Sequence, residues 1–314
     1  MRVRDAPWPG TDSGGRGTTV TTRQRARAAA ILAVALVGAV HVHGQRPTKG
    51  LNIAPVYEGW EPNADGSFNL IFGYFNRNWD EWVNVPVGPE NTLDPGGPDQ
   101  GQPTRFEPRR NQFIFRIRVP KDFGTKEIVW TLTSNGKTEK AYGTLKPDYV
   151  VDETVQHANT GAGGQLGTSP DLAGNRPPTL EVKGEKTRRV RVGEPVALTA
   201  VATDDGKPKI RPMPGFSGST RILPNTANGL RVAWLVYRGT GEVEFSPKQF
   251  TTWEDTRDGA NSPWASGWKP AALPANNTWD VHAMFKTPGE YVVRCLAHDG
   301  GLTAVEHVTV IVTP

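Results

Sequence analysis

Glycine and proline are spread through the whole chain, and their abundance constrains the fold more than any other feature. The sequence holds 35 glycines and 27 prolines among 314 residues, roughly 20% where about 12% is average. Proline breaks the hydrogen-bond ladder inside a helix and glycine weakens it, so a bundle of long helices is excluded. The 10 Trp, 11 Phe and 6 Tyr residues are enough for hydrophobic cores, so disorder along the whole chain is excluded as well.

An apolar segment near the N-terminus is typical of an export signal. Residues 28–40 (AAAILAVALVGAV) carry no charge and follow a cluster of arginines. This run of 13 residues matches the apolar part of a signal peptide and is too short to span a bilayer, which takes about 20. Small residues before Gln45 predict cleavage there, so we expect residues 1–44 to be removed. The long segment ahead of the arginines leaves Val20 as an alternative start.

The charge balance argues against nucleic acid as a partner. Residues 1–44 carry six Arg and two Asp, a net charge of +4, and the whole chain is also +4, so residues 45–314 sum to zero. A neutral body exerts no general attraction on phosphates. No second apolar stretch approaches membrane length. We therefore expect an exported chain without a membrane span, in the periplasm or outside the cell.

Alternation of apolar and polar residues predicts that residues 45–152 form an antiparallel β-sandwich domain. Asn135-Gly136 separates two such segments, and this pair favours a type I′ hairpin turn because both residues accept a positive φ. Short strands broken by Gly and Pro are typical of sandwiches. The apolar faces of three strands are predicted at Phe68, Leu70, Phe72 and Tyr74, at Phe113, Phe115, Ile117 and Val119, and at Ile128, Trp130 and Leu132.

Two segments lack the pattern of regular structure. Residues 88–108 hold many Gly and Pro residues, so we expect a long surface loop with edge pairing near residues 104–106. Residues 153–176 are rich in Gly, Ala and Thr and nearly free of large apolar groups. We predict a flexible linker there that joins two domains. Its Gly-rich part, residues 161–167, lacks the Lys and the helix of a phosphate-binding loop.

Residues 177–314 return to alternation and contain the only cysteine. Val308, Val310 and Val312 share one face of the last strand. Cys295 continues the apolar face of Tyr291 and Val293, so we expect a buried small hydrophobe rather than a reactive thiol. An exported chain with one cysteine has no internal disulfide, so each domain must be stabilised by its own core.

Five motifs follow one another in this second block. They are NRPP at 175–178, ATDDGKP at 202–208, Trp234, YRGTGEVEF at 237–245 and PGEYVVRCLAHDGGLTAVEHVTVIV at 288–312. Their order resembles a PKD-like, immunoglobulin-like β-sandwich domain. Two departures are a lengthened loop at 209–229 and a Trp-rich insertion at 251–277. The resemblance implies a non-catalytic extracellular module for spacing, adhesion or ligand contact.

Calcium is the candidate cofactor. Asp204, Asp205 and Asp299 lie in turns after strands, and such turns can meet at one pole of a sandwich, where carboxylates would bind Ca²⁺. The alternative is that Asp-Gly pairs serve only as good turns. Two further acidic loops carry Asp255 with Asp258 and Asn63 with Asp65.

A glycan-binding surface is the second candidate site. Trp253, Trp264 and Trp268 lie in the insertion, where their rings would stack on sugars while Glu254, Asp255 or Arg257 bonds hydroxyls. The alternative is that these rings fold back as a cover for the sandwich, because exposed Trp is uncommon. The same question applies to Trp60, Phe75, Trp79 and Trp82.

No catalytic centre is predicted. His282, His298 and His307 are expected at outward-facing strand positions, with the first two as neighbours across paired strands. No HExxH, CxxC or GxSxG motif is present in the sequence. The sequence therefore predicts an exported, non-catalytic binding or structural module that presents loops to a protein or glycan partner at the cell envelope. The alternatives are a carbohydrate-binding accessory module and a divergent secreted hydrolase.

Overall fold

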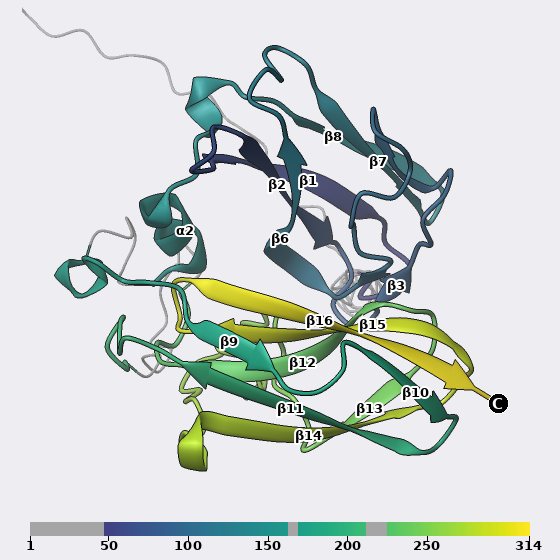
Figure 1. Cartoon of the computed structure of the whole chain (residues 1–314), viewed down its shortest axis with the longest axis vertical. Coiled ribbons are helices and arrows are strands. Elements are labelled where there is room, and N and C mark those ends of the chain that lie inside the picture. Colours follow the sequence, from purple (N-terminus) through teal and green to yellow (C-terminus); the bar gives the residue numbers. More distant parts are fainter. Residues whose placement is uncertain (1–46, 163–168, 212–224) are drawn as a thin grey trace, which may run out of the picture. The chain divides into compact units, whose positions relative to one another are not determined.

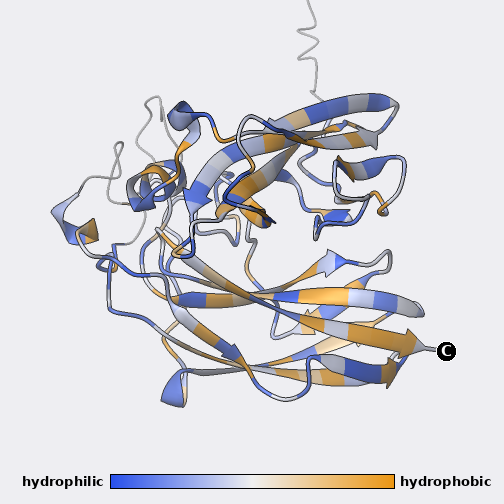
Figure 2. Cartoon of the chain, turned by 45° about the horizontal axis from the view of Figure 1, so that its top comes forward, coloured by the Kyte–Doolittle hydropathy of each residue, from blue (hydrophilic) through white to orange (hydrophobic). Residues whose placement is uncertain are grey.

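β-strands form most of the regular structure in the computed structural model (Figure 1). The structure describes residues 47–162, 169–211 and 225–314. The predicted all-β class is confirmed, since strands outnumber the few short helices and nearly all strand pairs are antiparallel. The predicted signal segment lies outside the described residues. Figure 2 shows hydrophobic and hydrophilic segments alternating along the strands, as expected where one face of a sheet is buried.

Two three-stranded sheets form the first block. One has the order β1 (Ile53–Pro62), β2 (Phe68–Asn76) and β6 (Arg109–Val119). The other has the order β4 (Asn91–Asp94), β7 (Ile128–Ser134) and β8 (Lys137–Gly143). A short pair, β3 (Val83–Asn84) with β5 (Arg105–Phe106), completes the block.

Aromatic rings fill the core between these sheets. Trp130 is fully buried, with its ring centroid 5.0 Å from that of Phe115 and 6.1 Å from that of Phe72. The predicted faces of β2 and β7 are thus confirmed. The hairpin turn is confirmed too, because Asn135 and Gly136 have φ angles of 47° and 74°.

Strand β6 departs from strict alternation at Phe113. The register between β2 and β6 shifts between Phe72 and Tyr74, and Phe113 has a φ of 53°. Such a bulge redirects the side chain and interrupts the two-residue period. The prediction that Phe113 shares the core face of Phe115 is therefore wrong, and its ring instead lines a cavity.

The two segments predicted as irregular contain short regular elements. Within residues 88–108, edge pairing by β5 is confirmed, but β4 was not predicted. Residues 153–160 form helix α2 (Glu153–Thr160), so the prediction of a flexible linker is wrong there. The Asp152 carboxylate accepts the Val155 N–H at the start of α2, and Gly161 ends it with a φ of 74°. These two caps stabilise the ends of a helix in which most residues have low helix propensity. A 3₁₀ turn, η2 (Pro170–Leu172), follows.

Two four-stranded sheets form the second block. One has the order β13 (Val243–Ser246), β14 (Thr278–Phe285), β11 (Pro195–Thr203) and β9 (Thr179–Val182). The other has the order β10 (Thr187–Arg191), β16 (Thr303–Thr313), β15 (Gly289–His298) and β12 (Arg231–Arg238). The 3₁₀ turns η1 (Pro147–Tyr149) and η3 (Ala275–Asn277) lie before α2 and β14.

This strand order is that of an immunoglobulin-like sandwich. Strands β9, β11, β14 and β13 correspond to A, B, E and D, and β12, β15 and β16 to C, F and G. Trp234 on β12 lies opposite Cys295 on β15, and both are buried in the core. Burial raises the pKa of the Cys295 thiol, so the predicted inert cysteine is confirmed as a buried group. The Tyr291 hydroxyl donates to the Thr287 carbonyl at 2.9 Å, as in a tyrosine corner.

The first block covers the outer face of the β12–β15–β16 sheet. The Tyr237 hydroxyl donates to the Gly101 carbonyl at 2.6 Å, and the Thr104 N–H donates to the Tyr237 carbonyl at 3.2 Å. The Arg238 guanidinium forms two bonds to the Asp99 carboxylate, at 2.8 and 3.0 Å. Residues 47–314 therefore combine two hydrophobic cores in one compact unit.

Candidate functional site

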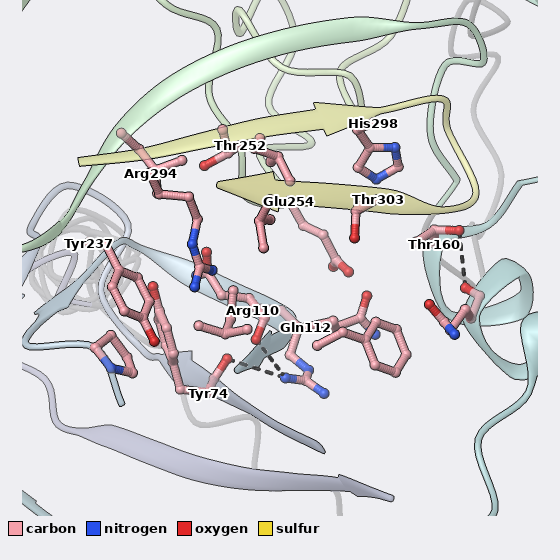
Figure 3. Close-up of a pocket in the computed structure, with 18 of the residues that line it drawn as sticks. Tyr74, Arg110, Gln112, Thr160, Tyr237, Thr252, Glu254, Arg294, His298 and Thr303 are labelled. Atoms are coloured by element: carbon pink, nitrogen blue, oxygen red, sulfur yellow. Dashed lines mark hydrogen bonds between the residues drawn. The ribbon is translucent and has the colours of Figure 1, made fainter. Parts of the chain in front are cut away.

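A cavity of about 80 Å³ lies where the first block meets the outer face of the second (Figure 3). Strands β2 and β6 contribute one wall, β12, β15 and β16 the opposite wall, and α2 and the insertion close the sides. This volume is room for several water molecules or one small organic molecule. Its charged and polar lining includes Tyr74, Arg110, Glu254, Arg294, His298 and Thr303.

Glu254 enters this cavity from the insertion without a partner. Its Oε1 atom is buried and has no hydrogen bond. Burial raises the pKa of this carboxyl to about 7, against the opposing effect of Arg110 and Arg109. Arg110 does not neutralise it directly, because the Arg110 Nη2 atom donates to Glu58 at 2.6 Å.

The Glu254→Gln variant is expected to flatten the dependence of stability on pH. The pKa of this carboxyl is near 4.5 in the unfolded chain and about 7 in the folded protein, so the folded protein binds the proton more tightly. The stability that this proton contributes is fully present below pH 4.5 and is lost as the pH rises through 7. The free energy of unfolding of the wild type falls by roughly 3 kcal/mol at most over this range. Urea unfolding at pH 5 and pH 8 measures this difference in the wild type and in E254Q. Glu290→Gln, at an exposed position, is the matched control; equal pH dependence of E254Q and the wild type would contradict the prediction.

Arg294 brings a positive charge to the same cavity. It is only 5% exposed, and its Nε atom donates to His307 Nε2 at 2.9 Å. The guanidinium carbon lies 3.9 Å from the centroid of the Tyr237 ring. Within residues 47–162, 169–211 and 225–314, no carboxylate forms an ion pair with it. Burial lowers the pKa of this guanidinium, which still carries its charge near neutral pH.

His298 brings a neutral imidazole to the cavity, with one N–H group as a hydrogen-bond donor. Burial and the neighbouring Arg231 hold the pKa of His298 well below its ordinary value. Its Nδ1 atom accepts the Gly300 N–H at 2.8 Å, which leaves the proton on Nε2. The predicted outward-facing position of His298 is confirmed, but its side chain is buried because the first block and Trp264 cover that face. Its predicted pairing with His282 is wrong, because His282 lies on β14 in the other sheet.

The predicted calcium ligands are only partly brought together. Burial raises the pKa of Asp299 to about 6, and the charge of Asp204 adds a smaller effect. The turns of Asp299 and Asp205 lie at the same end of the sandwich, because Asn175 donates to Asp299 and the next residue, Arg176, donates to Asp205. Asp299 Oδ1 accepts the N–H groups of Gly301 and Leu302, whereas Asp204 Oδ1 is buried without a partner. Asp205 is exposed and accepts backbone N–H groups. In the described part of the chain, no three His, Cys, Asp or Glu side chains form a metal-binding group.

The Trp-rich insertion mostly folds back on the protein. Trp253 and Trp264 are buried, so for these two rings the alternative of folding back as a cover is confirmed and the sugar-stacking surface is not formed. Asp255 is buried as well, and its carboxylate accepts two bonds from the Arg257 guanidinium, at 2.7 and 2.8 Å. Trp268 remains half-buried.

Trp268 lies on one side of a groove of about 360 Å³ between the insertion and strands β12 and β14. Its ring centroid is 5.6 Å from that of Phe250, and Trp279 also lines the groove. Two of its lining residues have buried donors without partners, Trp234 Nε1 and Arg231 Nε. Sequence reasoning singled out Trp268 but not these donors.

Sequence reasoning also missed most of the cavity. Glu254 was considered only as a partner of the Trp side chains, and Arg294 was not considered at all. A signal did exist for Arg294, since the nearly continuous apolar run around it, YVVRCLA, indicates that both faces of β15 are covered.

No helix in the described residues is both long and apolar enough to cross a membrane. No protein-family model and no curated protein sequence matches the chain.

Solved structures with immunoglobulin-like and related β-domains are similar to the chain at low identity. Immunoglobulin domains 1–4 of Sidekick-1 share 12% identity, with 83% of this chain and 48% of that chain covered and a TM-score of 0.22. Fibronectin(III)-like modules of CbhA from Clostridium thermocellum share 9%, with 83% and 94% covered and a TM-score of 0.21. The adhesin InvE of Yersinia pseudotuberculosis shares 11%, with 85% and 61% covered and a TM-score of 0.22. With TM-scores this low, the immunoglobulin-like order rests on the strand pairing described above.

Proposed function

We propose that this chain is an exported, non-catalytic binding module that holds a glycan at the cell envelope in the groove beside Trp268. The observation that carries the proposal is the chemistry of that groove. Half-buried Trp268 and Trp279 offer ring faces for stacking on sugars, and the exposed side chains of Lys248, Lys269 and Asp280 line the same groove. Sugars combine apolar ring faces with hydroxyl groups, so they match both features.

Export and the lack of catalysis are parts of the same proposal. The apolar run at residues 28–40 after the arginine cluster supports export to the periplasm or beyond. The buried histidines and aspartates support a structural role, since each is held by local bonds. His157 Nε2 is bonded to Asn175, and Asp299 accepts two backbone N–H groups. Turnover of a polysaccharide by the purified chain would favour the hydrolase alternative instead.

Replacing Trp268 by Ala is expected to weaken glycan binding at least about tenfold, because a stacked ring and its buried area are lost. A glycan array with the full chain identifies the ligand, and titration calorimetry measures the loss. Trp82→Ala is the matched control, since Trp82 is an exposed tryptophan of the first block. Binding of a protein partner but of no glycan would contradict this proposal, as would equal affinities of W268A and W82A.

We further propose that Ca²⁺ binds beside Asp204 and Asp299, at the pole where Asn175 Oδ1 is also buried without a partner. Carboxylate and amide oxygens are its preferred ligands. Saturating calcium is expected to raise the melting temperature by several degrees, because a ligand at 100 times its Kd stabilises by about 2.7 kcal/mol. Asp204→Asn should abolish the shift and Asp258→Asn, in an exposed loop, should keep it. Identical melting curves in calcium and in chelator would exclude the site.

A further inference from the structure

A buried arginine and a half-buried glutamate line the cavity between the blocks without pairing with each other. Figure 3 shows Arg294, from β15, and Glu254, from the insertion, both reaching into the space beside Tyr74 and Arg110. Glu254 Oε1 has no hydrogen bond, and in the described residues Arg294 has no carboxylate partner. Neither charge has an ion-pair partner among the residues that the structure describes, and a charge removed from water is costly without one, so both groups favour a partner of opposite charge that the cavity can admit.

The rest of the lining adds neutral polar groups to an apolar wall. His298 carries its proton on Nε2, and Figure 3 shows its ring near the Thr303 side chain at the edge of the same space. Within the described part of the chain, the Thr303 hydroxyl forms no hydrogen bond. Ile114, Leu296 and Val305 supply the apolar surface. This combination of a largely apolar wall and a few polar groups is typical of sites for small molecules.

We propose that the cavity binds a small zwitterion, whose carboxylate pairs with Arg294 and whose ammonium group pairs with Glu254. The volume of about 80 Å³ limits the ligand to a few carbon atoms. Amino acids without a large side chain belong to this class. A saccharide chain is too large for the cavity, so this site is separate from the groove beside Trp268, and either site can fail without the other.

Titration calorimetry of the full chain at pH 7 tests the proposal. The probes are glycine, β-alanine and γ-aminobutyrate, which separate the two charges by increasing lengths of chain. Propionate and propylamine are the matched probes with one charge each. We expect one of the zwitterions to bind at least about tenfold more tightly than either single-charge probe, because it forms two charge-assisted contacts.

Proton release gives a second, independent measurement. Burial raises the pKa of Glu254 to about 7, so a bound ammonium group should displace part of a proton. Repeating the titration in buffers with different ionisation enthalpies measures the number of protons released. We expect release with the wild type and none with Glu254→Gln, which keeps the shape of the side chain but not its charge.

Variants separate binding from folding. Glu254→Gln and Arg294→Lys are each expected to weaken the zwitterion at least about tenfold, since one removes a charge and the other removes the fork that fits a carboxylate. Glu290→Gln and Arg189→Lys, at exposed positions, are the matched controls, and melting curves verify that each variant is folded. The proposal is overturned if no zwitterion binds at millimolar concentration, if single-charge probes bind equally well, or if E254Q keeps the affinity of the wild type.

Discussion

Replacing Trp234 by Ala is expected to lower the free energy of unfolding by about 3–5 kcal/mol, the range for a large aromatic side chain removed from a core. Trp234 is 1% exposed and lies at the centre of β12, opposite Cys295. Its ring packs in the core cluster that joins the two sheets of the second block, so neighbouring strands cannot close the space that it leaves. Urea unfolding followed by far-ultraviolet circular dichroism measures the loss without relying on tryptophan fluorescence.

Trp82→Ala tests whether burial is the cause. Trp82 is 37% exposed and stacks under the Arg105 guanidinium, whose carbon lies 3.7 Å from the ring centroid. Losing an exposed cation–π contact costs about 0.5–1 kcal/mol. We therefore expect W82A to retain most of the stability that W234A loses. Comparable losses in the two variants would contradict the placement of Trp234 in the core.

The features that sequence reasoning predicted correctly are local. Alternation in β2 and β7 depends only on the two-residue period of a strand. The turn at Asn135-Gly136 depends on two residues that accept a positive φ. Burial of Cys295 follows from its apolar neighbours on one strand.

Features that depend on distant parts of the chain were missed. The bulge at Phe113 is a mismatch between β2 and β6, which the pattern of β6 alone does not contain. The cavity exists because the first block covers a sheet of the second through contacts such as that of Arg238 with Asp99, 139 residues apart. That cover also buries His298, which an isolated sandwich would expose. Helix α2 was missed because its caps, Asp152 and Gly161, carry a signal that composition does not measure.

Replacing Trp130 by Ala is the second large effect, with an expected loss of about 3–5 kcal/mol from the core of the first block. Trp130 is fully buried, and its Nε1 atom donates to Asn91 Oδ1 at 2.9 Å. The Asn91 amide in turn donates to the carbonyls of Val85 and Pro103. W130A therefore also leaves the buried Asn91 Oδ1 atom without a donor, which adds a cost of about 1–3 kcal/mol. We expect a loss of about the same size in Trp130→Phe, which keeps an aromatic ring and removes this hydrogen bond.

We also expect the unfolding of W130A to remain one cooperative transition, because the two cores share one interface. Tyr237, Arg238 and Thr104 bond across it, and the cavity with Glu254 and Arg294 is enclosed by both blocks. We expect W130A to shift one cooperative transition of the described unit, since loosening the first block uncovers the outer face of β12 and β15. Separate probes in the two cores, a fluorine label on Tyr291 and one on Phe72, should then report the same midpoint. Two midpoints, with only that of Phe72 lowered, would show that the blocks unfold independently.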